Sequence, residues 1–556
     1  LIFIGQSLYM IKLQTPLEAF LKWEKQTPNL IFLKQPLDGK QVTYTFEEAG
    51  QEARKLASYL ASLNLAKRSH IALLSKNCAH WIISDLAIMM ADHVSIPIYP
   101  TLNAASMNQV LVHSEAQVII IGKLDNFESQ RSGIPNIHRI GIGLFGIQEG
   151  KLWEDIVKEE KPLMDMPNPD LDELHTIIYT SGTTGNPKGV MHSIGNFAGS
   201  VNEFTKKIEL DDHPKLFSYL PLAHVAERMA IGTLGIYKGA EYSFAESLET
   251  FAFNLGECQP DLFFAVPRIW TKFQEKILEK LPQKKLSFLL KIPIINSIIK
   301  KKLKQKLGLG NAKYCISGAA PLAASLIRWY QTIGIAIIEA YGMTEDCILS
   351  HRNLPDDYKI GSVGKPWSSV TVKLTPEGEI CVKNNCLFKG YFKAQDITAS
   401  VFDADGFFKT GDCGEYDQDG FLTIIGRVKD QFKTDKGKYI SPSPIELKFS
   451  KNKNIEQICL VGTGLPQPIA LITLSELGQT KTKNELSESL VQTLEVMNPK
   501  FEKHEKIKKM IVMKSDWNVE NGLTTPTLKV KRSSIEKIHR DSYLSWFAMS
   551  DTIIFE

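Results

Sequence analysis

The densest group of residues that could do chemistry is TSGTTGNPKGV, at residues 180–190. It holds three glycines, four hydroxyl side chains and Lys188. Glycine lets the backbone approach an anion closely, while backbone N–H groups, hydroxyls and a lysine give phosphate oxygens their donors. A Walker A loop is excluded, because Gly185 and Lys188 are three positions apart rather than adjacent. The alternative is a glycine-rich surface turn, which this density of donors after an apolar strand disfavours.

Alternating strands and helices are predicted to position this loop. Apolar runs at 70–75, 94–100 and 117–122 have the length and composition of buried strands, and so does HTIIYT at 175–180, which leads into the loop. A helical stretch is expected at 79–91. Strands that alternate with helices imply βαβ units and a mostly parallel sheet.

Two local motifs refine this expectation. Thr45 and Glu48 form a capping box before the helical pattern at 48–65. The segment GIGLFG at 141–146 fits G-x-G-x-x-G, but no acidic residue follows about 20 positions later in a βαβ context. We therefore expect a loop or strand edge there, rather than a dinucleotide site.

The texture of the chain changes from about Val370. Short runs punctuated by Gly and Asp predict hairpins instead of βαβ units. The charged segment at 427–438 is a candidate hinge, and the remaining residues are predicted to form a small α+β domain.

Composition excludes several classes of protein. The 556 residues are 43% hydrophobic with a net charge of +3, which excludes a disordered chain and a strong overall electrostatic address. The eight cysteines form no CxxC pair, so a zinc site or redox dithiol is disfavoured and a reducing cytoplasm is expected. No run of 18 apolar residues is present, so no transmembrane segment is predicted.

One stretch departs from this balance. Residues 272–306 contain eleven Lys and two Glu, a net charge of +9, which leaves −6 for the rest of the chain. Apolar side chains are interleaved, so the stretch could contact an anionic membrane surface, at the inner face of a membrane. The alternative is a solvated helical face that covers the body of the protein. Nucleic-acid binding is disfavoured, because only Phe273 and Phe288 could stack.

Eight ordered motifs together resemble a known superfamily. YTSGTTGNPKGV is similar to the phosphate-binding signature of adenylate-forming (AMP-binding) enzymes, which include acyl-CoA synthetases, luciferases and the adenylation domains of peptide synthetases. LPLAHVAER and VPRIW resemble the long-chain acyl-CoA synthetase branch. The remaining motifs resemble the adenine, ribose, hinge and catalytic-lysine elements: SGAAPL at 317–322, EAYGMTE at 339–345, KTGD at 409–412, GRVKDQFK at 426–433 and TPTLKVKR at 525–532.

The resemblance implies a large N-terminal α/β domain, with doubly wound sheets and a β-barrel-like part, and a small mobile α+β C-terminal domain. The expected boundaries are 10–426 for the large domain, 427–430 for the hinge and 431–556 for the small domain. Residues 1–9 are expected to be an upstream extension before a native start at Met10.

The resemblance also implies roles at the nucleotide. Tyr341 would stack on adenine, Thr344 would donate to the α-phosphate, and Glu345 with Thr180 would hold Mg²⁺, which prefers carboxylate and phosphate oxygens. The full set of implied nucleotide and CoA residues is Thr180, Ser181, Gly182, Thr183, Thr184, Gly185, Lys188, Gly318, Ala319, Ala320, Glu339, Ala340, Tyr341, Gly342, Asp412, Arg427, Lys429 and Lys433.

Two implied residues have ordinary alternatives. Asp412 would accept from the ribose hydroxyls with Arg427 nearby, but a Gly-Asp pair is also common turn chemistry. His224 would lie near the acyl carboxylate, but a lone histidine in the apolar frame LPLAHVAER is also typical of a core.

Lys529 is the implied catalytic lysine, acting with Thr344, Glu345 and His224. A cation that bridges the attacking carboxylate and the α-phosphate would neutralise charge in the transition state. The family more often has Gly before this lysine, where this chain has Leu528, and Lys531 stays open as the alternative.

We therefore expect ATP-dependent ligation of a long-chain fatty acid to coenzyme A through an acyl-adenylate, with Mg²⁺ as cofactor. Lys429 would act as the hinge and Lys433 in the thioester step, after the small domain rotates. Two alternatives remain: a fatty acyl-AMP ligase that loads a carrier protein, and a non-catalytic lipid or membrane scaffold.

Overall fold

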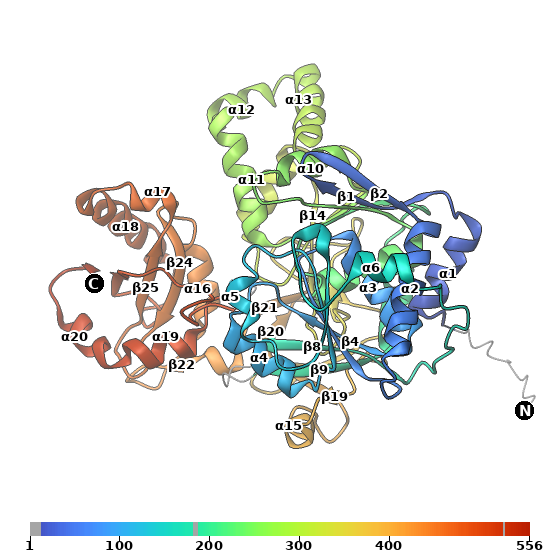
Figure 1. The fold of residues 1–556 in the computed structure, drawn as a ribbon. Helices are drawn as coiled ribbons and strands as arrows, with labels where there is room; N and C mark the ends of the chain where they lie inside the picture. Colours follow the sequence, from blue (N-terminus) through green and yellow to red (C-terminus); the bar gives the residue numbers. More distant parts are fainter. Residues whose placement is uncertain (1–12, 182–186, 526–528) are drawn as a thin grey trace, which may run out of the picture.

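The computed structural model describes residues 13–181, 187–525 and 529–556. A large body carries a smaller lobe at one side and a helical projection at its top (Figure 1). The expectation about residues 1–9 lies outside the described residues. The principal helices are α1 (Pro16–Gln26), α2 (Phe46–Ser62), α3 (Ala79–Met90), α4 (Ala104–His113), α6 (Trp153–Glu159), α7 (Ile194–Thr205), α8 (Val225–Glu227), α9 (Leu234–Lys238), α10 (Phe251–Cys258), α11 (Pro267–Lys280), α12 (Gln283–Leu289), α13 (Pro293–Lys306), α14 (Ala324–Thr332), α15 (Gln395–Ser400), α16 (Pro442–Phe449), α17 (Glu476–Gln479), α18 (Lys483–Met497), α19 (Arg532–His539) and α20 (Tyr543–Ala548).

Among the described residues, the first sheet has eight strands. One of them, β8 (Leu174–Ser181), leads into the phosphate-loop motif. β8 pairs in parallel with β4, which confirms the predicted parallel core, and antiparallel with β9. The residues 182–186 therefore connect two neighbouring antiparallel strands. The order is β19 (Gly390–Tyr391), β9 (Pro187–Ser193), β8 (Leu174–Ser181), β4 (Val94–Ile98), β3 (His70–Leu74), β5 (Val118–Ile121), β6 (His138–Gly141) and β7 (Lys151–Leu152).

Both local motifs that refined the sequence prediction behave as expected. The hydroxyl of Thr45 accepts from the Glu48 N–H at 3.2 Å, and the Glu48 carboxylate accepts from the Thr45 N–H at 2.8 Å, which starts α2. In GIGLFG, β6 ends at Gly141 and a 3₁₀ turn follows at Gly143–Phe145. This confirms the predicted strand edge.

The second sheet has nine strands. β10, β12, β13 and β14 are parallel, so their carboxyl ends meet at one edge, where ligands bind in open α/β sheets. The motifs with His224, Gly318 and Tyr341 each lie at or beyond the end of one of these strands. The order is β16 (Lys365–Pro366), β15 (His351–Arg352), β14 (Ile337–Tyr341), β13 (Tyr314–Ser317), β12 (Leu262–Ala265), β10 (Lys215–Ser218), β11 (Glu241–Phe244), β1 (Ile31–Leu37) and β2 (Lys40–Thr45).

A buried ion pair locks the two sheets together. The Arg228 guanidinium, which follows β10 and α8, lies 2.7 Å from the Asp85 carboxylate of α3. It also donates to Ser95 of β4 and Thr176 of β8, both at 2.7 Å. Because the guanidinium is 2% exposed and each bond goes to the first sheet's layer, Arg228 fixes the segment that carries His224.

The third sheet is antiparallel throughout, which confirms the hairpins predicted after Val370. Its strands are β17 (Thr371–Leu374), β18 (Glu379–Lys383), β20 (Phe408–Tyr416) and β21 (Leu422–Arg427), in that order. Asp412 of β20 lies opposite Arg427 of β21. The register of one hairpin thus brings together residues from two separate motifs.

The C-terminal lobe has its own hydrophobic cores on both faces of one sheet. The strands are β24 (Ile455–Val461), β25 (Ile469–Leu474), β26 (Lys509–Val512) and β27 (Ile553–Phe555), with the short hairpin β22 (Phe432–Lys433) and β23 (Tyr439–Ile440). Figure 1 shows this lobe beside the body. An ion pair of 2.5 Å joins Arg268 of α11 to Glu456 of β24 across the two domains. Among the described residues, no helix is both long and apolar enough to cross a membrane.

Candidate active site

Asp412 is the centre of the predicted ribose site. Its carboxylate accepts from the Tyr341 hydroxyl at 2.7 Å and from Nε of Arg427 at 2.8 Å. The carboxylate raises the pKa of Arg427, and burial together with Asp412 holds the pKa of Tyr341 well above its usual range. A carboxylate has about four acceptor positions, so two remain for two ribose hydroxyls. Three residues predicted from three motifs thus meet at one point.

The loop after β13 lies against the end of β14. A Cβ at Gly318 would meet the backbone oxygen of Ala340 at 3.2 Å. Ala319 is half-buried with φ of 65°, in the left-handed region that non-glycine residues seldom adopt, and Ala320 is exposed. A Cβ at Gly342 would meet the Ile348 backbone at 2.6 Å. This glycine is therefore required by its own turn, in addition to any approach of a ligand.

Glu339 is a buried acid on the adenine element. Burial raises its pKa to about 7, while nearby backbone N–H groups of Gly361 and Leu322 oppose the rise. Among the described residues, no group donates a hydrogen bond to Glu339 Oε2. The carboxyl therefore keeps an acceptor for a donor brought by a ligand, such as an exocyclic amine.

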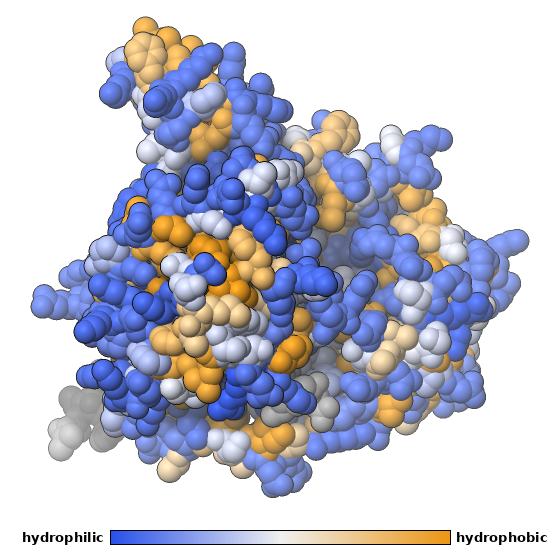
Figure 2. Space-filling model, turned by 90° about the vertical axis from the view of Figure 1, so that its left-hand side faces the viewer, coloured by the Kyte–Doolittle hydropathy of each residue, from blue (hydrophilic) through white to orange (hydrophobic). Residues whose placement is uncertain are grey.

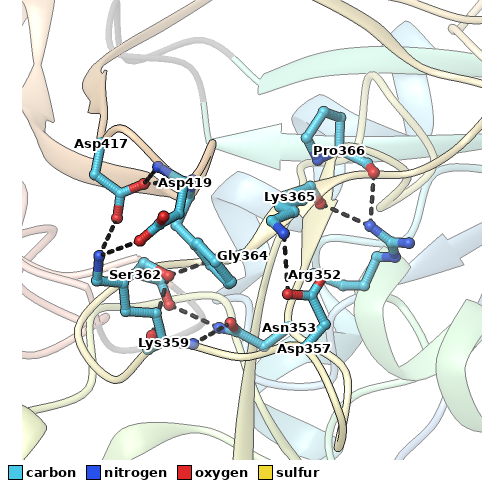
Figure 3. Close-up of polar contacts among 11 residues, drawn as sticks. Arg352, Asn353, Asp357, Lys359, Ser362, Gly364, Lys365, Pro366, Asp417 and Asp419 are labelled. Carbon is cyan, nitrogen blue, oxygen red and sulfur yellow. Dashed lines mark hydrogen bonds and ion pairs between the residues drawn. The ribbon is translucent and has the colours of Figure 1, made fainter.

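The loop between β15 and β16 braces the adenine and ribose elements (Figure 3). The Arg352 guanidinium donates to the backbone oxygen of Lys365 at 2.9 Å, which closes the base of the loop. The Lys359 ammonium lies 2.5 Å from Asp417, in the turn between β20 and β21. The loop thus ties the end of β14 to the hairpin that carries Asp412.

Glu345, the predicted magnesium ligand, is held by a tyrosine that the sequence analysis missed. The Tyr391 hydroxyl donates to Glu345 Oε1 at 2.8 Å, and the Lys188 ammonium lies 5.0 Å from the centre of the Tyr391 ring. Tyr391 thus joins the metal and phosphate elements. The Gly390–Tyr391 pair, 36 residues before the hinge at 427, gave no distinct signal, because this role depends on β19 pairing with β9.

Two buried side chains form hydrogen bonds to the backbone of the turn that carries Thr344 and Glu345. The buried Asp346 accepts from the Met343 N–H at 2.8 Å, and His192 donates to the Thr344 carbonyl at 2.7 Å. Burial raises the pKa of Asp346 to about 8 and lowers that of His192 to about 4. Thr344 is itself 7% exposed, so its position is set by these contacts.

The donor set at Glu345 suits magnesium. Among the described residues, no three His, Cys, Asp or Glu side chains gather as a metal cage. Magnesium usually takes one or two carboxylates and completes its shell with phosphate oxygens and waters. The single carboxylate of Glu345 therefore fits an ion that arrives with a nucleotide; Thr180, the predicted companion, lies near the end of β8.

The phosphate loop is only partly described. Thr180 pairs with Lys188 across β8 and β9, which brings the two ends of the loop together. The backbone of Ser181 continues β8 and pairs with Pro187. The predictions for Gly182, Thr183, Thr184 and Gly185 lie outside the described residues.

Lys529 reaches the large domain from the small one. Thr525 and Lys529 close a hairpin, with the Thr525 N–H donating to the Lys529 carbonyl at 2.8 Å. Desolvation by surrounding protein and the charge of Arg427 lower the pKa of the Lys529 ammonium to about 8, while Asp412 opposes the change. The residue as a whole is nevertheless exposed to solvent.

His224 lies within the field of the same lysine. Burial and the charge of Lys529 lower the pKa of His224 to about 3, so its imidazole is neutral at physiological pH. Its Nδ1 accepts from the Ala226 N–H at 3.2 Å, which leaves Nε2 to carry the proton. The charge of Lys529 acts on His224 and that of Arg427 acts on Lys529, whereas Lys531 directly precedes α19, and this placement favours Lys529.

The two remaining predicted lysines lie apart from this group. Lys429 is exposed in the 3₁₀ turn Val428–Asp430 between the domains. Lys433 is exposed on β22, with its ammonium 4.7 Å from the centre of the Tyr439 ring. In this arrangement of the domains, neither contacts Asp412 or His224.

Comparison with known proteins agrees with the site. The profile of the AMP-binding enzymes matches residues 20–392, and that of their C-terminal domain matches residues 429–543. The chain belongs to the AMP-binding enzyme family. This confirms the adenylate-forming resemblance predicted from the motifs.

Similar AMP-binding enzymes include long-chain-fatty-acid–CoA ligase 5 of Rattus norvegicus, 30% identical over 88% of this chain and 83% of the relative. Long-chain-fatty-acid–CoA ligase FadD15 of Mycobacterium tuberculosis is 28% identical over 93% of this chain and 94% of the relative. Among solved structures, the adenylation domain of a Mycobacterium chelonae carboxylate reductase has a TM-score of 0.79 at 20% identity, over 96% of this chain and 91% of that one. The anthranilate CoA ligase AuaEII with anthranoyl-AMP has a TM-score of 0.78 at 18% identity, over 96% and 99%. These likenesses support the fold: a large α/β domain followed by a small C-terminal domain.

Proposed function

We propose that this AMP-binding enzyme ligates a long-chain fatty acid to coenzyme A through an acyl-adenylate. The observation that carries the proposal is the electrostatic coupling of Lys529 to the site: its charge lowers the pKa of His224, and Arg427 lowers the pKa of Lys529 itself. A cation delivered to the ribose residues is placed to act where a carboxylate meets an α-phosphate. The names of the long-chain ligase relatives support the substrate class.

In the first step, a carboxylate oxygen attacks the α-phosphorus of ATP and pyrophosphate leaves. Asp412 and Arg427 hold the ribose, Tyr341 stacks on the adenine, and Glu339 accepts from its amine. Lys529 offsets the negative charge that the two anionic reactants bring together. When bound, Mg²⁺ held by Glu345 and Thr180 neutralises phosphate charge.

In the second step, the thiol sulfur of coenzyme A attacks the carbonyl carbon of the adenylate, the carbon–oxygen bond to AMP breaks, and the thiol proton is released. This step no longer brings a carboxylate against an α-phosphate, which is the meeting of anions that Lys529 serves in the first step. Rotation about Lys429 would remove Lys529 and bring Lys433 toward the site, since a few residues can absorb a large change of φ and ψ.

The location that fits this chemistry is the cytoplasm, at the inner face of a membrane. All eight cysteines are buried and free, which suits a reducing compartment. Long-chain acids partition into bilayers, so the substrate would be met at a membrane surface.

The test is pyrophosphate release with Mg·ATP across carboxylic acids from short to long chain and aromatic, with and without coenzyme A. The proposal expects turnover that depends on coenzyme A and peaks at long chains. Pyrophosphate release with transfer only to an acyl carrier protein would identify an acyl-AMP ligase instead. No pyrophosphate release with any acid would favour the non-catalytic scaffold.

A further inference from the structure

Helices α11, α12 and α13 form a projection from the second sheet (Figure 1). α13 has no buried residue, and α12 buries only Leu286. Leu290, Ile299 and Leu303 lie partly buried against the core beneath. The projection is therefore anchored along one side, and its outer end is free of the body.

The outer end of the projection is apolar. Phe288 is 65% exposed, Ile294 76% and Ile298 49%. Figure 2 shows apolar residues gathered at the tip of this projection, with hydrophilic residues around them. A helical face that only covers the body would turn its large apolar side chains inward, and these three do not turn inward.

The same projection carries the unbalanced charge of the chain. None of the eleven lysines within 272–306 forms an ion pair among the described residues. The stretch keeps its net charge of +9, while the rest of the chain carries −6. Many lysines on the same helices as exposed apolar side chains are typical of segments that lie in the interface of an anionic bilayer.

We propose that this projection docks on a bilayer with anionic headgroups: Phe288, Ile294 and Ile298 enter the interface and the surrounding lysines contact the lipid phosphates and carboxylates. A second copy of the chain is a poor occupant, because two stretches of +9 would repel. A nucleic acid would leave the apolar tip in water and offers little stacking.

The first test is sedimentation of the full chain with phosphatidylcholine vesicles, with and without phosphatidylserine. Binding should require phosphatidylserine and weaken as salt rises. The triple variant Lys301→Gln, Lys302→Gln and Lys306→Gln should bind ~100-fold more weakly, since each lysine near such a surface contributes about a factor of five. The matched control neutralises three exposed lysines of the small domain and should bind as the parent does: Lys451→Gln, Lys453→Gln and Lys503→Gln.

The second test reports insertion of the tip. Because all eight native cysteines are buried, Phe288→Cys can be labelled selectively with an environment-sensitive dye. Its emission should shift to the blue on anionic vesicles, and that of a label at Lys451→Cys should not. Vesicle binding that the Lys301, Lys302 and Lys306 changes leave intact, or a tip label that stays in water, would overturn the proposal.

The docking itself does not require ligase activity. The proposed function enters only as the reason why the protein would dock on a membrane. Both tests use vesicles without ATP, fatty acid or coenzyme A. Loss of docking with normal pyrophosphate release would reject the membrane surface alone, and docking without any release would reject the ligase alone.

Discussion

The nucleotide edge of the large domain and the Lys529 hairpin of the small domain are built in different ways. Asp412 accepts hydrogen bonds from Tyr341 of the second sheet and from Arg427, which lies opposite it in the third sheet. Lys529 instead stands on a short hairpin and acts on the site through charge. One half of the site is therefore assembled by hydrogen bonds among neighbouring strands, while the other half depends on where the small domain stands.

Removing the charge of Lys529, which the small domain supplies, should have the largest effect. Lys529→Met is expected to slow acyl-adenylate formation by about 10²–10³-fold, as loss of one electrostatic stabiliser of a transition state does. Thioester formation from a supplied acyl-adenylate should stay near the parent rate. Measuring the two half-reactions separately checks this. Lys531→Met is the control, and a greater loss from it than from Lys529→Met would reverse the assignment.

Changing Asp412, at the centre of the predicted ribose site, should have a smaller effect on the reaction. Asp412→Asn removes the charge that binds Arg427 and Tyr341, and we expect the KM for ATP to rise about 10–100-fold, in line with charged hydrogen bonds of about 1.5–3 kcal/mol. Steady-state kinetics with varied ATP checks it. Asp419→Asn, in the exposed turn of the same hairpin, should leave the KM unchanged.

The pH dependence of the adenylation rate should report the charge of Lys529. The pKa of Lys529 is lowered to about 8, and its charged form is the active one. Adenylation should therefore be level below about pH 7, fall as the pH rises through 8, and be about tenfold lower at pH 9. In Lys529→Arg this limb should disappear, because a guanidinium stays charged. The same fall in Lys529→Arg would place the titrating group elsewhere.

A substitution of Tyr391 tests how the large domain holds Glu345, the predicted magnesium ligand. Tyr391→Phe loses only the hydrogen bond to Glu345, so the Mg²⁺ concentration for half-maximal rate should rise about fivefold, as expected for about 1 kcal/mol. Saturating Mg²⁺ should restore the rate, which loss of fold would not allow. Tyr439→Phe, on the small domain, serves as the control.

The smallest effect is expected at the ion pair between the domains. Arg268 and Glu456 lie 2.5 Å apart but are partly exposed, so their coupling should be at most about 1 kcal/mol. A double-mutant cycle on the adenylation rate, with Arg268→Ala and Glu456→Ala, measures it. A coupling of zero would show that the pair does not bias the placement of Lys529.

Sequence reasoning identified the motif residues, because each motif joins an unusual composition to a chemical need. The predicted parallel strands and the hairpins after Val370 followed from periodicity and turn residues, and the structure confirms them. Tyr391, Asp346 and Arg228 escaped notice. Their roles come from pairing between distant strands and from burial, which no local pattern encodes.

The sequence by itself determined the family, the two-domain order and the group of candidate residues for the chemistry. Only the tertiary structure decided which of them come together: Asp412 faces Arg427 because two strands pair in one register, and the charge of Lys529 acts on His224 because the small domain stands beside the large one. It also decided that Phe288, Ile294 and Ile298 point into solvent. Contacts between residues far apart in a chain depend on packing, whereas spacing within a motif fixes only local geometry.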